Sequence, residues 1–104
     1  MKSVVMFSAA VLSLAGGAAF AADAPQLLKD KACLACHTLD KKLVGPAYKE
    51  VAAKYKARKD AEAYLVKKIR EGSTGVWGQI PMPPNTTVKD DEAKVLAKYI
   101  LGVK

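Results

Sequence analysis

The sequence contains few of the residues that binding and catalytic sites most often use. Among its 104 residues there are two cysteines, one histidine and one tryptophan. With a single histidine, the two cysteines cannot complete the four ligands of a structural zinc site. The chain is also too short for a barrel enzyme, a dinucleotide-binding fold or a kinase, and it has no internal repeat or low-complexity tract. These absences leave one small domain.

The first part of the chain differs from the rest because it is apolar and carries a single charge, that of Lys2. A positive start, an apolar centre and small residues at the end are typical of a secretory signal. We predict that residues 1–21 are removed, with cleavage after Ala21 or Ala22, and that residues 22–104 form one exported domain. The uncharged run is also long enough to span a bilayer, so a domain held at the membrane by an uncleaved leader stays an alternative.

Four stretches of the mature chain have the spacing of amphipathic helices, and none has the alternation of a strand. The sequence therefore predicts an all-α fold. The helices are expected to begin near Asp23, Tyr48, Asp60 and Asp90. The first has a capping-box pattern of Asp23 with Gln26, and the third is expected to end at Gly72.

The segment between the third and fourth helices, Ser73–Val88, is rich in glycine and proline. It nevertheless contains Trp77, Ile80 and Met82, which a loop facing only solvent would not need. Long loops without secondary structure are uncommon in compact domains and are usually functional. We therefore expect this loop to pack against something.

One motif carries chemistry of its own, Cys33-Leu34-Ala35-Cys36-His37. The pattern C-x-x-C-H is the attachment signature of c-type haem. Cysteines three residues apart lie on one face of a helical turn, so both sulfurs can bond to the vinyl groups of one porphyrin, and the next histidine can ligate its iron. A disulfide here would close a very small loop and stabilise little, and a thioredoxin-like pair would need a βαβ unit.

A haem with one histidine ligand needs a second axial ligand, and the chain has no second histidine. Met82 is the only methionine outside the predicted leader, and it lies in the stiff sequence Pro81-Met82-Pro83-Pro84. A stiff loop can hold a weak thioether ligand at little entropic cost. Met82 is therefore the candidate for the sixth iron position, with a lysine as its competitor.

Four motifs occur in a familiar order along the mature chain: KACLACH from Lys31, VGPAY from Val44, GVWG from Gly75 and IPMPPN from Ile80. Through them the chain resembles the small single-haem class I bacterial cytochromes c of the c-551/c-552 type. The resemblance covers essentially the whole mature chain. It implies four helices wrapped around one haem c, attached through Cys33 and Cys36, with one edge of the haem exposed.

The resemblance also implies roles for individual residues. His37 and Met82 match the axial ligands, and the carbonyl of Pro46 matches the acceptor of the imidazole N–H. Trp77 resembles the indole that donates to a haem propionate, and Asn85 resembles the amide near the methionine sulfur.

Three positions depart from the family pattern. Lys68 stands where many relatives carry an arginine that faces a propionate, so it keeps the charge and loses the planar fork. Ala32 replaces a frequent glycine. Lys89 replaces a serine that often caps the last helix, which leaves Thr87 or Asp90 to cap it.

With both axial positions filled, such a site stores an electron and transforms no substrate. We therefore expect an exported, soluble, monomeric electron carrier of the periplasm rather than an enzyme. The resemblance implies a quinol-oxidising complex as donor and a terminal oxidase or nitrite reductase as acceptor. A haem enzyme or gas sensor with a labile Met82 is the alternative.

The mature charge, 16 basic minus 10 acidic residues or +6, is spread along the chain, which does not favour nucleic-acid binding. Lys41 and Lys42, shortly after the haem motif, are the candidates for steering acidic redox partners.

Overall fold

The computed structural model describes Ser3 and residues 23–104 of the chain; the predicted signal peptide and its cleavage point lie outside the described residues. Four α-helices follow one another along residues 23–104: α1 (Ala24–Asp30), α2 (Tyr48–Tyr55), α3 (Ala61–Glu71) and α4 (Asp90–Leu101). A short 3₁₀ turn, η2 (Cys33–Ala35), follows α1. In this part of the chain, strand-like pairing is limited to two isolated bridges, His37 with Lys42 and Ser73 with Met82. The all-α prediction is confirmed.

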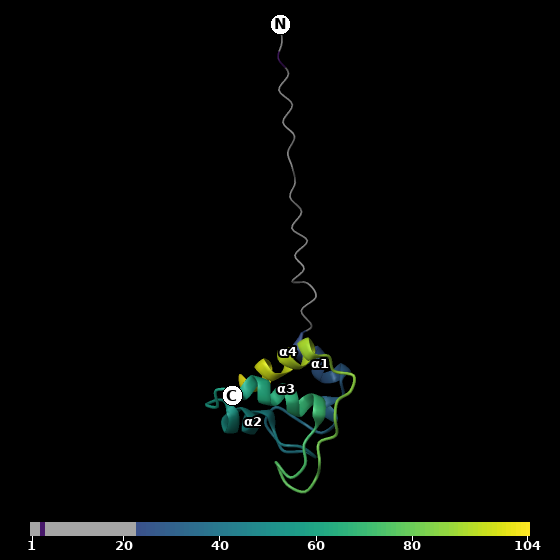
Figure 1. Ribbon diagram of the computed structural model, residues 1–104, viewed down its shortest axis with the longest axis vertical. Coiled ribbons are helices and arrows are strands. Elements are labelled where there is room, and N and C mark those ends of the chain that lie inside the picture. Colours follow the sequence, from purple (N-terminus) through teal and green to yellow (C-terminus); the bar gives the residue numbers. More distant parts are fainter. Residues whose placement is uncertain (1–2, 4–22) are drawn as a thin grey trace.

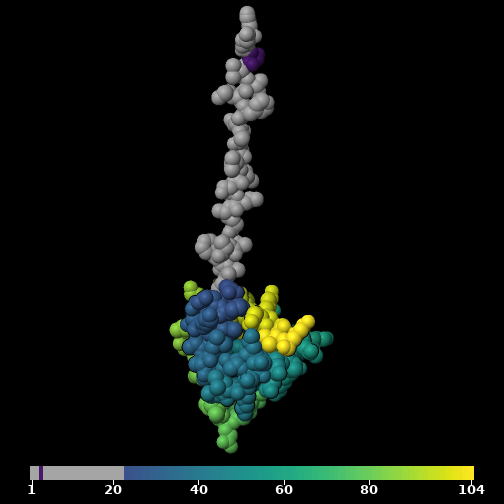
Figure 2. Space-filling model, turned by 180° about the vertical axis from the view of Figure 1, so that it is seen from behind, coloured from purple at the N-terminus to yellow at the C-terminus, as the bar shows by residue number. Residues whose placement is uncertain are grey.

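Helix α4 organises the domain, because α1, α2 and α3 all pack against it (Figure 1). The predicted apolar stripes form the core: α2 buries Val51 and Ala52, α3 buries Leu65 and Ile69, and α4 buries residues including Leu96. Burying such aliphatic side chains contributes about 1.5–3 kcal/mol each. The view from behind shows α1 and the segment after it lying beside the C-terminal part of the chain (Figure 2).

The ends of α1 and α4 differ from the sequence-based predictions in two details. Asp23 is the N-cap of α1 but makes no side-chain capping bond, and the Gln26 side chain instead donates to Asp30 at 2.9 Å. Neither Thr87 nor Asp90 caps α4. Lys89 is its N-cap, and the Lys89 backbone N–H donates to the Glu92 carboxylate at 2.9 Å. An acid at the third helical position thus satisfies an N-terminal N–H, which is half of a capping box.

The third helix begins and ends where predicted. Asp60 is its N-cap, although the Asp60 carboxylate pairs with Arg58 rather than with the helix backbone. Gly72 is its C-cap and adopts φ 78° and ψ −174°, a region that is essentially restricted to glycine. The chain therefore turns sharply at Gly72 and enters the loop Ser73–Val88. This loop descends from α3 to the bottom of the view and returns along the right to α4 (Figure 1).

Candidate functional site

The two cysteines and the histidine are placed by a tight turn between α1 and α2. The backbone N–H groups of Cys36 and His37 donate to the Cys33 carbonyl at 3.2 and 3.0 Å. Both sulfurs consequently reach the same cavity, which Cys33, Cys36 and His37 line. Cys33 is half-buried, and this burial raises the pKa of its thiol.

The turn requires an unusual backbone at its start. Ala32 has φ 59°, the left-handed region that favours glycine. The departure from the family pattern at Ala32 therefore has a physical cost, because an alanine occupies a position for which glycine is better suited.

His37 is buried, and three neighbours fix its ring. Its Nδ1 lies 2.8 Å from the carbonyl oxygen of Pro46. Because a carbonyl only accepts, Nδ1 carries the hydrogen and Nε2 keeps its lone pair for a metal ion. The backbone at Gly45 approaches so closely that a Cβ there would lie 2.5 Å from Cε1 of His37. The ring of Tyr48 stacks on the imidazole, with centroids 4.8 Å apart and planes inclined by 18°.

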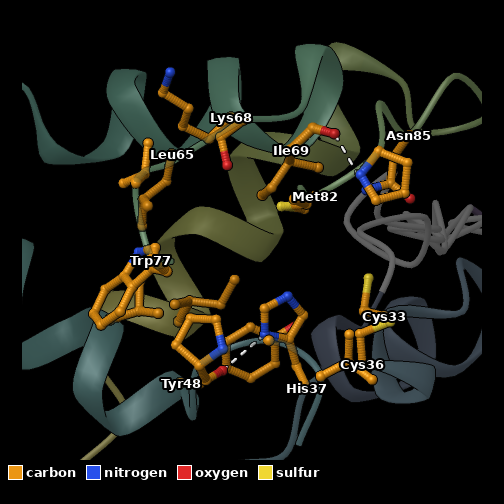
Figure 3. Close-up of a pocket in the computed structure, with 18 of the residues that line it drawn as sticks. Cys33, Cys36, His37, Tyr48, Leu65, Lys68, Ile69, Trp77, Met82 and Asn85 are labelled. Carbon is orange, nitrogen blue, oxygen red and sulfur yellow. Dashed lines mark hydrogen bonds between the residues drawn. The ribbon is translucent and has the colours of Figure 1, made fainter. Parts of the chain in front are cut away.

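Met82 lies on the opposite wall of the same cavity, as Figure 3 shows. Its backbone is clamped by Ser73, because the N–H of each residue donates to the carbonyl of the other at 2.9 and 3.0 Å. The loop comes so close to Gly72 that a Cβ there would lie 2.9 Å from the Pro84 nitrogen and closer still to the Met82 carbonyl. Proline stiffness is therefore only part of what holds Met82, and the end of α3 holds the rest.

Trp77 and Asn85 also line the cavity, from the two ends of the same loop. The Trp77 ring meets the edge of Tyr55, with centroids 6.2 Å apart, and the Lys54 ammonium lies 4.5 Å from its centroid. The Asn85 backbone N–H and side-chain amide both donate to the Ile69 carbonyl, at 3.0 and 3.2 Å. Asn85 thus ties the loop to α3 close to Met82.

Lys68 lines the cavity through its stem. Its ammonium lies 5.4 Å from the Tyr64 ring centroid, and in Figure 3 it points away from His37 and Met82.

The cavity has a volume of about 260 Å³, and its lining is mostly apolar. The exposed residues of its lining mark its mouth, and there are nine of them: Ala32, Lys42, Val44, Glu50, Gly75, Trp77, Ile80, Pro81 and Pro83. The predicted packing of the Ser73–Val88 loop is thereby explained, because the loop forms one wall of a cavity. Leu65, Ile69, Leu96 and Ile100 form its floor.

The residues of the cavity fit a haem and do not fit a bare metal ion. In residues 23–104 no group of three or more His, Cys, Asp or Glu side chains gathers as a metal site. The donors present are one imidazole and one thioether on facing walls, with two thiols at one end (Figure 3). Such a set suits an iron whose other four ligands come from a macrocycle, and the apolar lining suits its faces.

All eight site residues predicted from the sequence belong to this cavity. The sequence does not predict the clamp of Ser73 on Met82, the close approach of the loop to Gly72 or the Tyr48 stack. It predicts Gly72 only as a helix stop and Tyr48 only as the start of a helix and part of the VGPAY motif, since periodicity does not show which distant segment a residue touches.

The chain is similar to known proteins over most of its length. The sequence model of the family Cytochrome c matches residues 21–104. Cytochrome c-551 of Pseudomonas aeruginosa is 57% identical over 86 residues, which are 83% of this chain and 82% of that protein. Cytochrome c-552 of Nitrosomonas europaea is 53% identical over 98 residues, 94% of this chain and 92% of that one. The crystal structure of the wild-type Nitrosomonas europaea protein superimposes with a TM-score of 0.75 at 55% identity, covering 77% of this chain and 99% of that one.

Proposed function

The chain belongs to the cytochrome c family and is a small c-type cytochrome electron carrier, and on this premise we propose that His37 and Met82 are the two axial ligands of its haem iron. The observation that carries the proposal is their placement on facing walls of one apolar cavity that both cysteines also line (Figure 3). Cys33 and Cys36 would form the thioether bonds.

The chain's own residues prepare each ligand. Pro46 accepts the Nδ1 hydrogen of His37, so Nε2 is free and the imidazole becomes more basic. The clamp from Ser73 holds Met82 in place before any bond to iron forms. Trp77 and Asn85 lie before and after Met82 in the same loop and both line the cavity. The indole N–H of Trp77 would donate to a haem propionate, and the Asn85 amide, held by the Ile69 carbonyl, would lie near the methionine sulfur. Lys68 contributes its apolar stem to the wall.

Bound haem would supply an iron that alternates between the ferrous and ferric states. If His37 and Met82 both hold the iron, no substrate could bind to it without displacing one of them. Thioether ligation and the apolar lining both favour the ferrous form and raise the reduction potential. Rigid ligands need little rearrangement at each transfer, which suits storage of one electron.

The optical spectrum of the purified protein tests the ligation. The oxidised wild type should show the weak far-red charge-transfer band of a methionine sulfur on low-spin ferric iron. Met82→Ala should lose that band and bind carbon monoxide, whereas Val76→Ala, another substitution in the lining, should keep the band. A band that persists in Met82→Ala would refute the assignment. Carbon monoxide binding by the native protein at mild pH would favour a sensor or enzyme.

The mouth of the cavity is the surface we assign to redox partners. Val44 and Ile80 are 45% and 66% exposed there, and apolar side chains that gather at one exposed site are typical of an interaction surface. Lys42 lies beside them in the lining, whereas Lys41 is exposed but does not line the cavity. This combination fits a partner with an apolar contact area and an acidic group that faces Lys42. The partners would be a quinol-oxidising complex and a terminal oxidase or nitrite reductase.

Charge reversal tests this docking surface. Lys42→Glu should slow electron transfer to an acidic partner several-fold at low salt, with the difference shrinking as salt screens the charges. Lys98→Glu, an exposed position on α4 away from the cavity, is the matched control. Equal rates for the two variants would remove Lys42 from the docking surface.

We also assign the protein to the periplasm, after cleavage of the leader following Ala21 or Ala22. No helix within residues 23–104 has the length and apolar character needed to cross a bilayer. The mass of the protein purified from its host should correspond to a chain starting at Ala22 or Asp23, plus one haem. A mass that includes residues 1–21 would instead support a domain held at the membrane.

A further inference from the structure

Two kinds of contact hold the imidazole of His37: a hydrogen bond at its edge and an aromatic stack on its face. The hydrogen bond from Nδ1 to the Pro46 carbonyl fixes one edge of the ring. A single hydrogen bond still allows a ring to rock about the N–H···O line. The remaining contacts must therefore decide the plane in which the imidazole lies.

Tyr48 provides a flat surface against that plane. Its ring is inclined by 18° to the imidazole at a centroid separation of 4.8 Å, within the range of offset-stacked aromatic pairs. Figure 3 shows the two rings together on the lower wall of the cavity. Because the stack covers a face and not the edge that carries Nε2, it leaves the lone pair of His37 accessible.

Tyr48 is itself rigidly placed. Its side chain is 4% exposed, and it is the first residue of α2. Its backbone N–H donates to the Thr38 carbonyl at 2.9 Å, which ties α2 directly to the residue after His37. Rotation of the imidazole out of its plane would therefore have to displace the buried Tyr48 ring or move the start of α2.

We propose that Tyr48 is a positioning residue that sets the plane of the His37 imidazole and, through it, the electronic structure of the haem iron. The proposal rests on the ligation by His37 proposed above. The plane of an axial imidazole decides how its π orbital splits the iron d orbitals, so it is visible in the magnetic properties of the ferric state. Gly45 and Pro46 fix where the ring lies, and Tyr48 fixes how it is turned.

The test uses the haem-loaded protein and four chains: wild type, Tyr48→Phe, Tyr48→Leu and Tyr99→Leu. Tyr99 is a matched control because it is a partly buried tyrosine of α4 that does not line the cavity. Electron paramagnetic resonance of the ferric proteins reports the g values. Tyr48→Phe keeps the stack and should keep the wild-type g values, as should Tyr99→Leu. Tyr48→Leu should shift the largest g value and broaden the signal.

Two outcomes for the variants would overturn the proposal, and one for the wild type would overturn its premise. Wild-type g values in Tyr48→Leu would show that the stack does not set the plane. A shift as large in Tyr48→Phe as in Tyr48→Leu would show that the hydroxyl acts and the ring does not. A wild-type ferric spectrum without the signature of an imidazole ligand would overturn the ligation by His37 itself, and with it this proposal, so the two failures are distinguishable.

A measurement on the wild type covers the case in which Tyr48→Leu does not retain haem. In the diamagnetic ferrous protein, nuclear Overhauser effects should connect the Tyr48 ring protons with the imidazole protons of His37. Their absence from a fully assigned spectrum would overturn the proposal without any variant.

Discussion

Gly72 offers the sharpest test of how the fold holds Met82. Its backbone adopts φ 78° and ψ −174°, which an alanine adopts only with strain of about 1–3 kcal/mol. A Cβ at this position would also lie 2.9 Å from the Pro84 nitrogen and would collide with the Met82 carbonyl. These are backbone atoms, so relief requires the loop itself to move.

The expected cost of Gly72→Ala follows from these contacts. Movement of the loop weakens the two backbone hydrogen bonds between Ser73 and Met82, each worth about 0.5–1.5 kcal/mol. Together with the strain, we expect the free energy of unfolding to fall by about 3–5 kcal/mol. The displaced loop should also weaken the far-red band of methionine-ligated ferric haem.

Gly75 is the control position, because a substitution there strains the backbone without a steric clash. It has φ 75°, similar to Gly72, but a Cβ there would meet nothing within 4 Å. Gly75→Ala should therefore cost only about 1 kcal/mol, because strain is partly offset by the lower entropy of the unfolded chain. Urea denaturation of both holoproteins, followed by haem absorbance, measures the difference. If Gly72→Ala matched Gly75→Ala in stability and kept the full far-red band, the clamp would be refuted.

Three further predictions concern the other wall of the cavity and the core. Ala32→Gly should raise the free energy of unfolding by about 1 kcal/mol because glycine adopts φ 59° without strain. The control Ala35→Gly, in the same turn, should lower the free energy of unfolding. Equal effects of the two substitutions in urea denaturation would contradict this prediction. Gly45→Ala should lower the free energy of unfolding by about 1–3 kcal/mol because the added Cβ overpacks the contact with His37. The displaced imidazole should alter the g values of the ferric protein. An unchanged spectrum would count against the close approach of Gly45 to His37. Burial raises the pKa of Tyr55 from 10.0 to about 12, so the unfolded chain ionises first and stability should fall as pH rises through that window. In Tyr55→Phe this fall should be shallower, and identical slopes in urea titrations would refute the assignment to Tyr55.

The helices could be predicted from the sequence because their signals are local. Val51 and Ala52 on one helix and Leu65 and Ile69 on another follow the helical repeat, and all four are buried. Helix caps were less predictable. Several short polar side chains compete near each end, and their choice depends on partners such as Arg58, which takes the carboxylate of Asp60.

The candidate donor groups of the site could be predicted from the spacing of residues close in sequence and from the small number of methionines in the chain. Cys33, Cys36 and His37 lie within one turn, so their joint position follows from local geometry alone. Met82 was identifiable because the chain outside the predicted leader offers no other methionine. Neither inference required knowledge of how distant segments pack.

Tertiary structure decided how those groups are held. The clamp between Ser73 and Met82 and the stack of Tyr48 on His37 each join segments that no periodic pattern links. The left-handed turn at Ala32 likewise carries no sequence signal of its own, because alanine usually avoids that conformation. The sequence by itself therefore determined the helices and the donor atoms, which depend on neighbours along the chain. Only packing could determine the orientation of the ring and the position of the loop, since these depend on contacts formed when the whole chain closes around the cavity.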